Sequence, residues 1–339
     1  MEVPFSIIAA AYIGFFIALS ANLCLITLIL TQTKHSFGSY KYLMLCFAIW
    51  SLWYSFVDIM VQPSMHAFKN GFIVICTSWF KYNSTIGPIS IAIYSTSFGL
   101  TVVLLAIHFV YRYIAISRPG DIRYFQRPKV FIWPVLFFGI AIFWWCDVYF
   151  LLYSNEEVMN EYMRDTVALV YQDEIEKLSY IGPIYYSIEP NGSYLINWRC
   201  CLAMFNIYVI AIATLFTIVS LGFRIHRKMR SVQSMIAKKT RELQRQLFYA
   251  LMVQTIVPII FMYTPATVLF LSPLFGIELG DKVHMTSIML ALYPALDPMV
   301  VMVIITDYRR FILHKVCGYS TTIPTMTKVS NATRSNNAV

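Results

Sequence analysis

Seven mostly apolar stretches of roughly 20 residues run through this 339-residue sequence, and they restrict the folds it can adopt. A helix needs about 20 residues to cross the roughly 30 Å hydrocarbon core of a bilayer. The candidate spans cover residues 5–30, 42–61, 87–110, 130–152, 200–223, 248–271 and 285–305. Barrel strands alternate over about 10 residues, whereas these runs are continuously apolar. We therefore expect an all-α bundle of seven transmembrane helices.

The amino-acid composition supports a single membrane-embedded unit. Hydrophobic residues make up 58% of the chain and charged residues only 13%, whereas soluble domains carry roughly 25% charged residues. We expect one transmembrane domain over residues 1–317. The remaining residues, 318–339, are rich in Ser, Thr and Asn and predict a disordered tail.

The placement of positive charge orients this bundle. Most of the 26 Lys and Arg residues fall in the first, third and fifth loops and in the C-terminal tail. Cytoplasmic loops of membrane proteins carry such an excess, so we expect an extracellular N-terminus and a cytoplasmic C-terminus. The net charge of +9 follows from this bias, and no nucleic-acid partner is expected.

The loop over residues 153–199 is the main extracellular segment in this topology. Part of it, residues 155–178, fits a short amphipathic helix that would suit a lid over the bundle. The apolar positions near one face are Met159, Met163, Val167, Val170 and Ile175. The alternative is a solvated acidic loop.

Three short motifs predict covalent modification. Glycosylation sequons at Asn83 and Asn191 fall outside, where glycans are added, while the sequon at Asn331 falls in the cytoplasmic tail and is expected to stay bare. Cys317 follows an amphipathic segment and is a candidate for palmitoylation.

The third span ends in a basic and aromatic motif. Arg112 lies at a depth where its cation is expected to face the cytoplasm, with Tyr111 and Tyr113 in the aromatic belt. Such an arginine can form contacts that differ between an inactive and an active bundle. The alternative is an ordinary anchor on the cytoplasmic side.

Prolines and buried carboxylates mark the inner spans. The sixth span contains Pro258 and Pro265, and the seventh contains Pro294 and Pro298, so both helices are expected to be kinked. Asp297 lies within the seventh span and should face the bundle interior with a polar partner, where it can act in a helix-repositioning switch. Asp58 and Asp147 are expected near the outer interface, within reach of water.

Two cytoplasmic segments predict contacts with lipid or protein. Residues 224–247 carry eight basic residues and one acidic residue, and residues 238–248 are expected to extend the sixth span as a helix. Anionic lipid headgroups are attracted to such a surface, which a protein partner can also use. After the seventh span, residues 306–317 form an amphipathic pattern with Tyr308, Phe311, Ile312 and Val316 on one face, which predicts a short helix on the membrane.

Taken together, these motifs resemble the nematode seven-transmembrane chemoreceptors of the Str class, a branch of the G-protein-coupled receptor superfamily. The phrases that carry the likeness are Gly38 to Met44, His108 to Tyr113, Leu243 to Phe248, Ile259 to Tyr263 with Pro265, and Leu292 to Pro294 through Asp297 and Pro298. They extend from the first cytoplasmic loop to the last span. The resemblance implies an odorant receptor in the ciliary membrane of chemosensory neurons, which couples a small, volatile molecule to a heterotrimeric G protein.

The resemblance also implies roles for single residues. Arg112 is similar in position to the arginine of the Asp-Arg-Tyr signature, and Asp297 with Pro298 is similar to the Asn-Pro motif of the seventh helix. The sequence departs from the pattern at Tyr111, which replaces the acidic neighbour of the arginine. Because the loop over residues 153–199 has no cysteine, the usual extracellular disulfide is in doubt. A pairing of Cys76 with Cys200 or Cys201 remains open.

We expect the ligand to bind among the outer halves of spans three, five, six and seven. The candidate lining residues are Tyr94, Ser97, Asn206, Tyr263 and Tyr293, which combine aromatic bulk with a few hydrogen-bonding groups, as in many small-molecule pockets. Helix packing is the alternative role for each of them. The expected switch and coupling residues are Tyr111, Arg112, Tyr113, Lys238, Lys239, Arg241, Asp297 and Pro298.

Other classes of membrane protein fit less well. An odorant-gated cation channel is the main alternative, although no ring-forming acidic filter is evident. A transporter would be expected to show an inverted repeat. An enzyme is not expected, since no HExxH occurs and the three intramembrane aspartates lie at unequal depths. No cofactor and no metal site are expected, because neither a CxxC pair nor zinc-spaced His and Cys residues occur.

Overall fold

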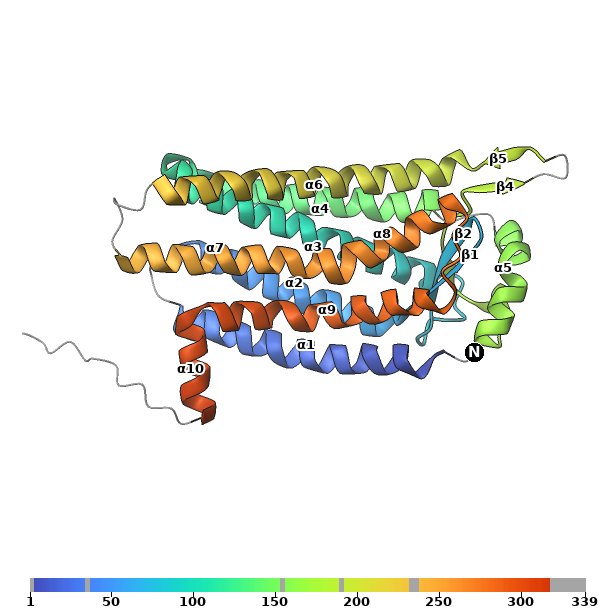
Figure 1. Cartoon of the computed structure of the whole chain (residues 1–339), viewed down its shortest axis with the longest axis horizontal. Coiled ribbons are helices and arrows are strands. Elements are labelled where there is room, and N and C mark those ends of the chain that lie inside the picture. Colours follow the sequence, from blue (N-terminus) through green and yellow to red (C-terminus); the bar gives the residue numbers. More distant parts are fainter. Residues whose placement is uncertain (1–2, 34–36, 153–155, 189–191, 232–237, 318–339) are drawn as a thin grey trace, which may run out of the picture.

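The computed structural model describes residues 3–33, 37–152, 156–188, 192–231 and 238–317, and seven of its helices are long and apolar enough to cross a membrane. The spans are built from α1 (Phe5–Gln32), α2 (Tyr40–Val61), α3 (Ile86–Ser117), α4 (Ile132–Cys146), α6 (Trp198–Ser231), α7 (Lys238–Pro258) with α8 (Thr264–Leu271), and α9 (Val283–Ile304). All seven predicted spans are confirmed. They lie side by side in one bundle (Figure 1).

Three of these helices are longer at the cytoplasmic end than the apolar runs alone indicate. α3 continues to Ser117, α6 continues to Ser231, and α7 begins at Lys238. Polar residues with good helix propensity can continue the backbone hydrogen bonds into water. The predicted cytoplasmic extension of the sixth span is therefore confirmed, and it brings basic side chains below the membrane.

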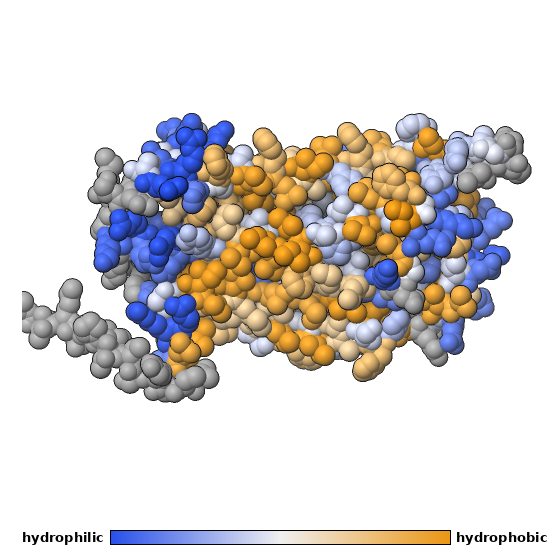
Figure 2. Space-filling view, viewed as in Figure 1, coloured by the Kyte–Doolittle hydropathy of each residue, from blue (hydrophilic) through white to orange (hydrophobic). Residues whose placement is uncertain are grey.

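The surface has the polarity of a membrane protein. An apolar band surrounds the middle of the molecule, and hydrophilic residues gather at both ends (Figure 2). Large apolar side chains such as Phe16, Ile142 and Phe216 are more than half exposed. Lipid is the solvent in which such an exposed band is stable.

α3 is the most buried span and contacts α2, α4, α6 and α7. On the other side of the bundle, α1 packs along α9 and α2. Irregular turns interrupt two spans: η4 (Asp147–Leu152) follows α4, and η6 (Ile259–Tyr263) joins α7 to α8 directly after Pro258. Both are π-helical turns, a form that is frequent at functional sites.

The prolines of α9 create a hydrogen-bond deficit that neighbouring helices satisfy. Pro298 has no N–H group, so the carbonyl of Pro294, four residues earlier, receives no intrahelical bond. Asn22 Nδ2 and Ser51 Oγ donate to this carbonyl at 3.2 and 3.3 Å. A single polar node thus ties α1 and α2 to the proline-containing part of α9.

The extracellular side carries a small sheet that the sequence did not predict. β1 (Pro63–Phe68) and β2 (Gly71–Cys76) form an antiparallel hairpin, and β3 (Tyr180–Ile181) pairs with β2. Farther along, β4 (Tyr186–Ile188) pairs with β5 (Tyr194–Ile196). The hairpin lies at the same end of the bundle as α5 (Figure 1).

The predicted amphipathic helix of the extracellular loop is confirmed as α5 (Glu156–Tyr171). Its apolar face packs against the hairpin residues Ile73 and Ile75 in a separate hydrophobic cluster. Members of this cluster from α5 and the following turn include Met159, Met163, Val167, Tyr171 and Ile175, all fully buried. The hairpin and α5 therefore form one packed cap.

The chain ends its described part in α10 (Thr306–Cys317), which turns away from the bundle at the cytoplasmic end (Figure 1). Tyr308 is buried, and Phe311 and Ile312 pack against the inner hydrophobic cluster. The predicted helix after the seventh span is thus confirmed. The side chain of Cys317 and the tail over residues 318–339 lie outside the described residues.

Candidate functional site

The guanidinium of Arg112 is buried at the cytoplasmic end of α3. Its side chain is 1% exposed, its Cζ atom lies 3.9 Å from the ring centroid of Tyr40, and Nη1 donates a hydrogen bond to Oε1 of Gln244. The expectation that this cation faces the cytoplasm is wrong for this arrangement. The reason is tertiary, because α7 extends below the membrane and covers the end of α3.

The tyrosines beside Arg112 have different surroundings. Tyr111 is 5% exposed and stacks on Tyr40 at 5.5 Å, with Phe125 packed edge-on at 4.9 Å. It does not join an aromatic belt in contact with lipid, as the sequence had suggested. Tyr113 is half-buried and faces α6 across a cavity.

Three glutamines hold α7 to its neighbours. Gln244 bonds to Arg112 of α3, and Oε1 of Gln246 accepts the backbone N–H of Thr306 at 3.1 Å. Thr306 begins α10, where the first N–H groups of a helix have no intrahelical acceptor. Deeper in the membrane, Nε2 of Gln254 donates to Oδ2 of Asp297 at 3.0 Å. We call Gln244, Gln246 and Gln254 with these partners the glutamine latch.

Asp297 occupies the position that the sequence predicts. It is 1% exposed, it faces the bundle interior and it has Gln254 as a polar partner. Its neighbour Pro298 has no backbone N–H group. The carbonyl of Pro294 is therefore available to accept hydrogen bonds from α1 and α2. The sequence indicated the aspartate, but its partner depends on how α7 packs on α9.

An aromatic cluster fills part of the outer half of the bundle. Tyr54 and Tyr94 stack at 5.8 Å with their hydroxyls 3.3 Å apart, and Tyr293 packs edge-on against Tyr54. The ring centroid of Tyr263, in η6, lies 5.3 Å from that of Phe98. The predicted ligand-binding residues Tyr94, Tyr263 and Tyr293 all belong to the same buried cluster and its packed neighbours.

The other two predicted lining residues lie elsewhere. Ser97 accepts a hydrogen bond from Nε1 of Trp53 at 3.1 Å and borders a groove of about 300 Å³ among α2, α3 and α4. Exposed residues of α4 such as Ile142 line this groove, so it opens toward lipid. Asn206 donates to Asp147 at 2.7 Å. The structure therefore brings three of the five residues together.

The two outer aspartates are buried, which corrects the expectation that water reaches them. Asp58 is 3% exposed and Asp147 is 4% exposed. Asn206 of α6 donates to one carboxylate oxygen of Asp147. The sequence did not predict this burial because it depends on which helices pack around the two carboxyl groups.

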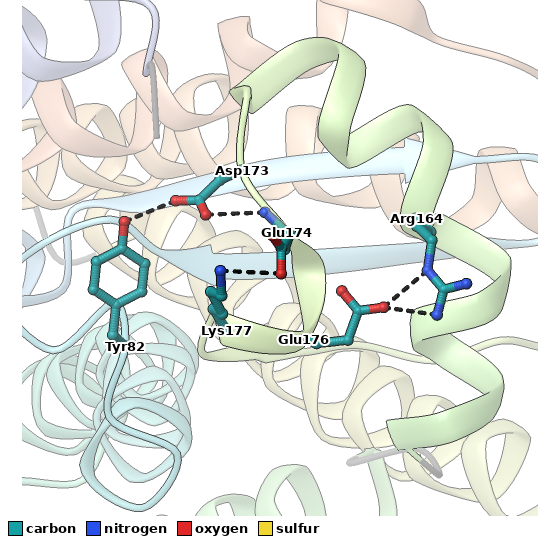
Figure 3. Close-up of polar contacts among 6 residues, drawn as sticks. All are labelled: Tyr82, Arg164, Asp173, Glu174, Glu176 and Lys177. Atoms are coloured by element: carbon teal, nitrogen blue, oxygen red, sulfur yellow. Dashed lines mark hydrogen bonds and ion pairs between the residues drawn. The ribbon is translucent and has the colours of Figure 1, made fainter.

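A polar cavity of about 410 Å³ opens beside the cap, between the start of α3 and the segment that follows α5. Figure 3 shows the interactions that shape its rim: Tyr82 donates to Asp173 at 2.8 Å, Lys177 pairs with Glu174 at 3.0 Å, and Arg164 pairs with Glu176 at 2.7 Å. These ion pairs are exposed and contribute about 0 to 1 kcal/mol each. A backbone hydrogen bond and Arg164 lower the pKa of Glu176.

A buried histidine connects α5 to the hairpin. Nε2 of His66 lies 3.0 Å from Oγ1 of Thr166, and the ring of Tyr171 packs against it. Burial and the neighbouring His284 lower the pKa of His66 from 6.5 to about 4. The neutral ring is therefore the form that the packed cap accommodates.

This shift predicts that the cap loosens in acid. The stabilisation is complete above about pH 6.5 and is lost as the pH falls toward 4, because a released His66 binds a proton that the packed one does not. Hydrogen exchange of the α5 amides, corrected for intrinsic rates, is expected to accelerate in this range. His66→Gln keeps a hydrogen-bonding group without the titration and should remove most of the effect. Equal acceleration in both proteins would contradict this prediction.

The remaining predicted residues have mixed outcomes. Asn83 is exposed, and its Oδ1 accepts the N–H groups of Thr85 and Ile86 at the start of α3. Lys238 and Arg241 are exposed at the cytoplasmic end of α7. Asn191, Asn331 and the side chain of Lys239 lie outside the described residues.

The cysteine pairing that the sequence left open is not present. Cys76 and Cys201 are free thiols, so Cys76 forms neither of the two disulfides. Sγ of Cys76 lies 3.4 Å from the carbonyl of Val61. In the described part of the chain, no group of three or more His, Cys, Asp or Glu residues could hold a metal ion.

Sequence reasoning missed the partners of the buried charges. Tyr40 and Gln244 form the surroundings of Arg112, and Gln254 is the partner of Asp297. Gln254 did carry a signal, since an amide inside an apolar span needs an interhelical partner. No comparable signal marked Tyr40, which resembles any aromatic residue at a membrane boundary.

Comparison with known proteins agrees with this architecture. Residues 7–313 match the family described as serpentine type 7TM GPCR chemoreceptor Str. Serpentine receptor class r-10 of Caenorhabditis elegans is 33% identical over 91% of this chain and 90% of its own length. The protein of the same name from Caenorhabditis briggsae is 31% identical, and G-protein coupled receptor str-33 of Caenorhabditis elegans is 26% identical over 88% of this chain and 87% of its own. The chain therefore belongs to the Str family of seven-transmembrane, G-protein-coupled chemoreceptors.

Proposed function

We propose that this receptor binds a small, largely apolar odorant in the outer half of its bundle and activates a heterotrimeric G protein at its cytoplasmic face. The observation that carries the proposal is the burial of Arg112 beneath α7. A buried cation held by a neutral amide on a neighbouring helix is a two-state element, because movement of α7 exposes it. Such discrete rearrangements are how packed helices transmit signals.

The aromatic cluster is connected to the glutamine latch through one interrupted helix. Tyr263 lies in η6, the π-helical turn between α7 and α8, and Gln254 and Gln244 lie on α7. A ligand that contacts Tyr263 or Tyr293 acts at the π-helical turn of the sixth span. It activates the receptor only if it binds the open arrangement more tightly than the closed one.

The chemistry of the cluster indicates the class of ligand. Tyr94, Tyr263 and Tyr293 offer large ring surfaces and hydroxyl groups. A small molecule with an apolar body and one or two hydrogen-bonding groups suits these surroundings. Ser97 and Asn206 are weaker candidates for ligand contact, because their side chains already form hydrogen bonds with Trp53 and Asp147.

When α7 moves and Arg112 becomes exposed, its guanidinium and the cations at the start of α7 together form the coupling surface. Lys238 and Arg241 are solvent-exposed there, and positive charge accelerates association with an acidic partner surface. In this proposal Tyr111 positions Arg112 through Tyr40, and Tyr113 borders the opening. Asp297 and Pro298 set the resting geometry of α9.

We further propose that the receptor resides in the plasma membrane, in the ciliary membrane of chemosensory neurons. The exposed side chain of Asn83 supports glycosylation on the outer side. Asn191 and Cys317 remain candidates for glycosylation and palmitoylation on sequence grounds.

A cell-based assay tests the proposal. The receptor is expressed with a cyclic-nucleotide or calcium reporter and screened with volatile compounds. Arg112→Ala is expected to reduce the ligand response by about tenfold or more at equal surface expression, since the coupling contact is lost. Arg123→Ala, which removes an exposed arginine from the neighbouring loop, should respond normally. A response that persists under G-protein blockade would instead support an odorant-gated cation channel.

A further inference from the structure

A basic cavity opens at the cytoplasmic end of the bundle, between α3 and α6. It has a volume of about 420 Å³ and is lined by Tyr113, Ser117, Arg224, Arg227, Lys228 and Ser231. Pockets that bind small ligands in proteins occupy about 300 to 1,000 Å³. The cavity therefore has room for a phosphorylated headgroup.

Regular helix geometry builds this cavity. The four α6 residues follow the spacing i, i+3, i+4 and i+7, which places them on one face of the helix. Tyr113 and Ser117, spaced i and i+4, form the opposite wall on α3. Because α3 and α6 pack against each other directly, the walls are held in place without any ligand.

The charge of the cavity is uncompensated within the described part of the chain. No acidic residue is among those that line it, and none of the ion pairs found there involves Arg224, Arg227 or Lys228. The adjacent cavity between α6 and α7 differs, because Glu242 lines it and pairs with Arg245 at 3.1 Å. The α3–α6 cavity is thus the stronger attractor for an anion.

A buried hydroxyl lies in the α3 wall of the cavity. Oγ of Ser117 is shielded from solvent and has no hydrogen-bond partner among the described residues. Buried polar atoms nearly always have a partner. Because solvent does not reach this oxygen, the Ser117 side chain must turn toward the cavity before it can donate to a phosphate oxygen there.

The surface of α6 indicates that the ligand comes from the bilayer. Phe216, Val219 and Phe223 are 73%, 67% and 62% exposed, and their spacing forms an apolar stripe that leads to the cavity. At its end the guanidinium of Arg227 lies 5.8 Å from the ring centroid of Phe223. Acyl chains can pack along the stripe while the headgroup reaches the cations.

We propose that the α3–α6 cavity binds the headgroup of a phospholipid that carries a phosphomonoester, such as a phosphorylated inositol lipid. A phosphomonoester has a charge of about −1.5 to −2 at neutral pH and three acceptor oxygens. These match the three cations and the hydroxyl of Tyr113. The Ser231 hydroxyl already donates to the backbone carbonyl of Lys228 at 2.9 Å. A singly charged serine headgroup would leave most of the positive charge unpaired. The site is separate from the proposed odorant pocket and is tested without an odorant.

Lipid binding to the full-length receptor in phosphatidylcholine nanodiscs tests the site. The probe is a small fraction of labelled phosphatidylinositol bisphosphate, compared with phosphatidylserine at the same total charge. The triple variant Arg224→Gln, Arg227→Gln, Lys228→Gln is expected to bind the probe at least about tenfold more weakly, since each cation near a membrane contributes roughly fivefold. The matched triple variant Arg230→Gln, Arg241→Gln, Arg245→Gln removes the same charge from the α6–α7 cavity and should weaken binding clearly less than the first variant, because those cations surround Glu242.

Several outcomes would overturn the proposal. Equal losses in the two triple variants would show diffuse attraction to the membrane, and equal binding of phosphatidylserine would exclude a site for a phosphomonoester. Displacement by soluble inositol trisphosphate at the same concentration as the lipid would assign the site to a free phosphate. Normal lipid binding with lost coupling would assign the cations to a protein partner. If the first triple variant fails to fold, the single variants Arg227→Gln and Arg230→Gln decide: a loss of binding of about threefold or more that is confined to Arg227→Gln supports the site, and equal losses or no loss reject it.

Discussion

Replacing Gln244 with leucine is expected to raise signalling in the absence of ligand by roughly tenfold. Leucine cannot accept the hydrogen bond from Arg112, so a buried guanidinium loses that bond in the resting arrangement. Hydrogen bonds to charged groups contribute about 1.5 to 3 kcal/mol, and 1.4 kcal/mol is a factor of ten in an equilibrium. Basal reporter activity per receptor at the cell surface measures the effect.

Matched variants separate this latch from general effects of glutamine loss. Gln126→Leu removes an exposed glutamine from the same cytoplasmic face and should leave basal activity unchanged. Gln244→Glu supplies a carboxylate to the same guanidinium and should lower basal activity below that of the unmodified receptor. Unchanged basal activity in Gln244→Leu at normal surface levels would refute the role of this hydrogen bond.

Replacing Gly14 with alanine is expected to destabilise the bundle by about 1 to 3 kcal/mol and to lower surface expression severalfold. A Cβ atom at this position would lie 2.4 Å from the backbone carbonyl oxygen of Ala291. Backbone cannot rotate away as a side chain can, so α1 and α9 must separate. That separation would also weaken the bond from Asn22 to Pro294. Thermal unfolding of the purified receptor measures the loss.

Gly139 provides the control for this substitution. It lies on α4, where an added Cβ would meet no atom within 4 Å. Gly139→Ala should therefore be neutral or stabilise the protein by about 1 kcal/mol or less, since alanine favours helix. If Gly14→Ala unfolds at the same temperature as Gly139→Ala, the close approach of α1 to α9 does not contribute to stability.

Predictions that depend on local sequence succeeded in the described residues. Each span must form its own backbone hydrogen bonds within lipid, so apolar runs of sufficient length predict where the helices lie. The amphipathic pattern in α5 and the helix formers after Lys238 are local in the same sense. The sequence placed Asp297 correctly because an ionisable side chain within a span must face the bundle interior and not lipid, whichever residue is its partner.

Predictions that depend on pairing between distant segments failed or remained open. The β1–β2 hairpin lies between the second and third predicted spans, where no element was predicted, and its burial depends on α5 from a later loop. The burial of Asp58 and Asp147 was not predicted either. The ligand-binding and coupling roles of Tyr94, Tyr263, Tyr293, Lys238 and Arg241 remain predictions.

The sequence by itself determined the number of spans, their orientation and the family, because lipid burial and charge asymmetry act on each segment independently. Only the tertiary structure decided which side chains meet: Arg112 with Gln244, Asp297 with Gln254, and the three cations of α6 with Ser117. The physical reason is that helix periodicity specifies a face but not the neighbour that the face meets. In this receptor the proposed switch and the proposed lipid site both lie at such meeting points.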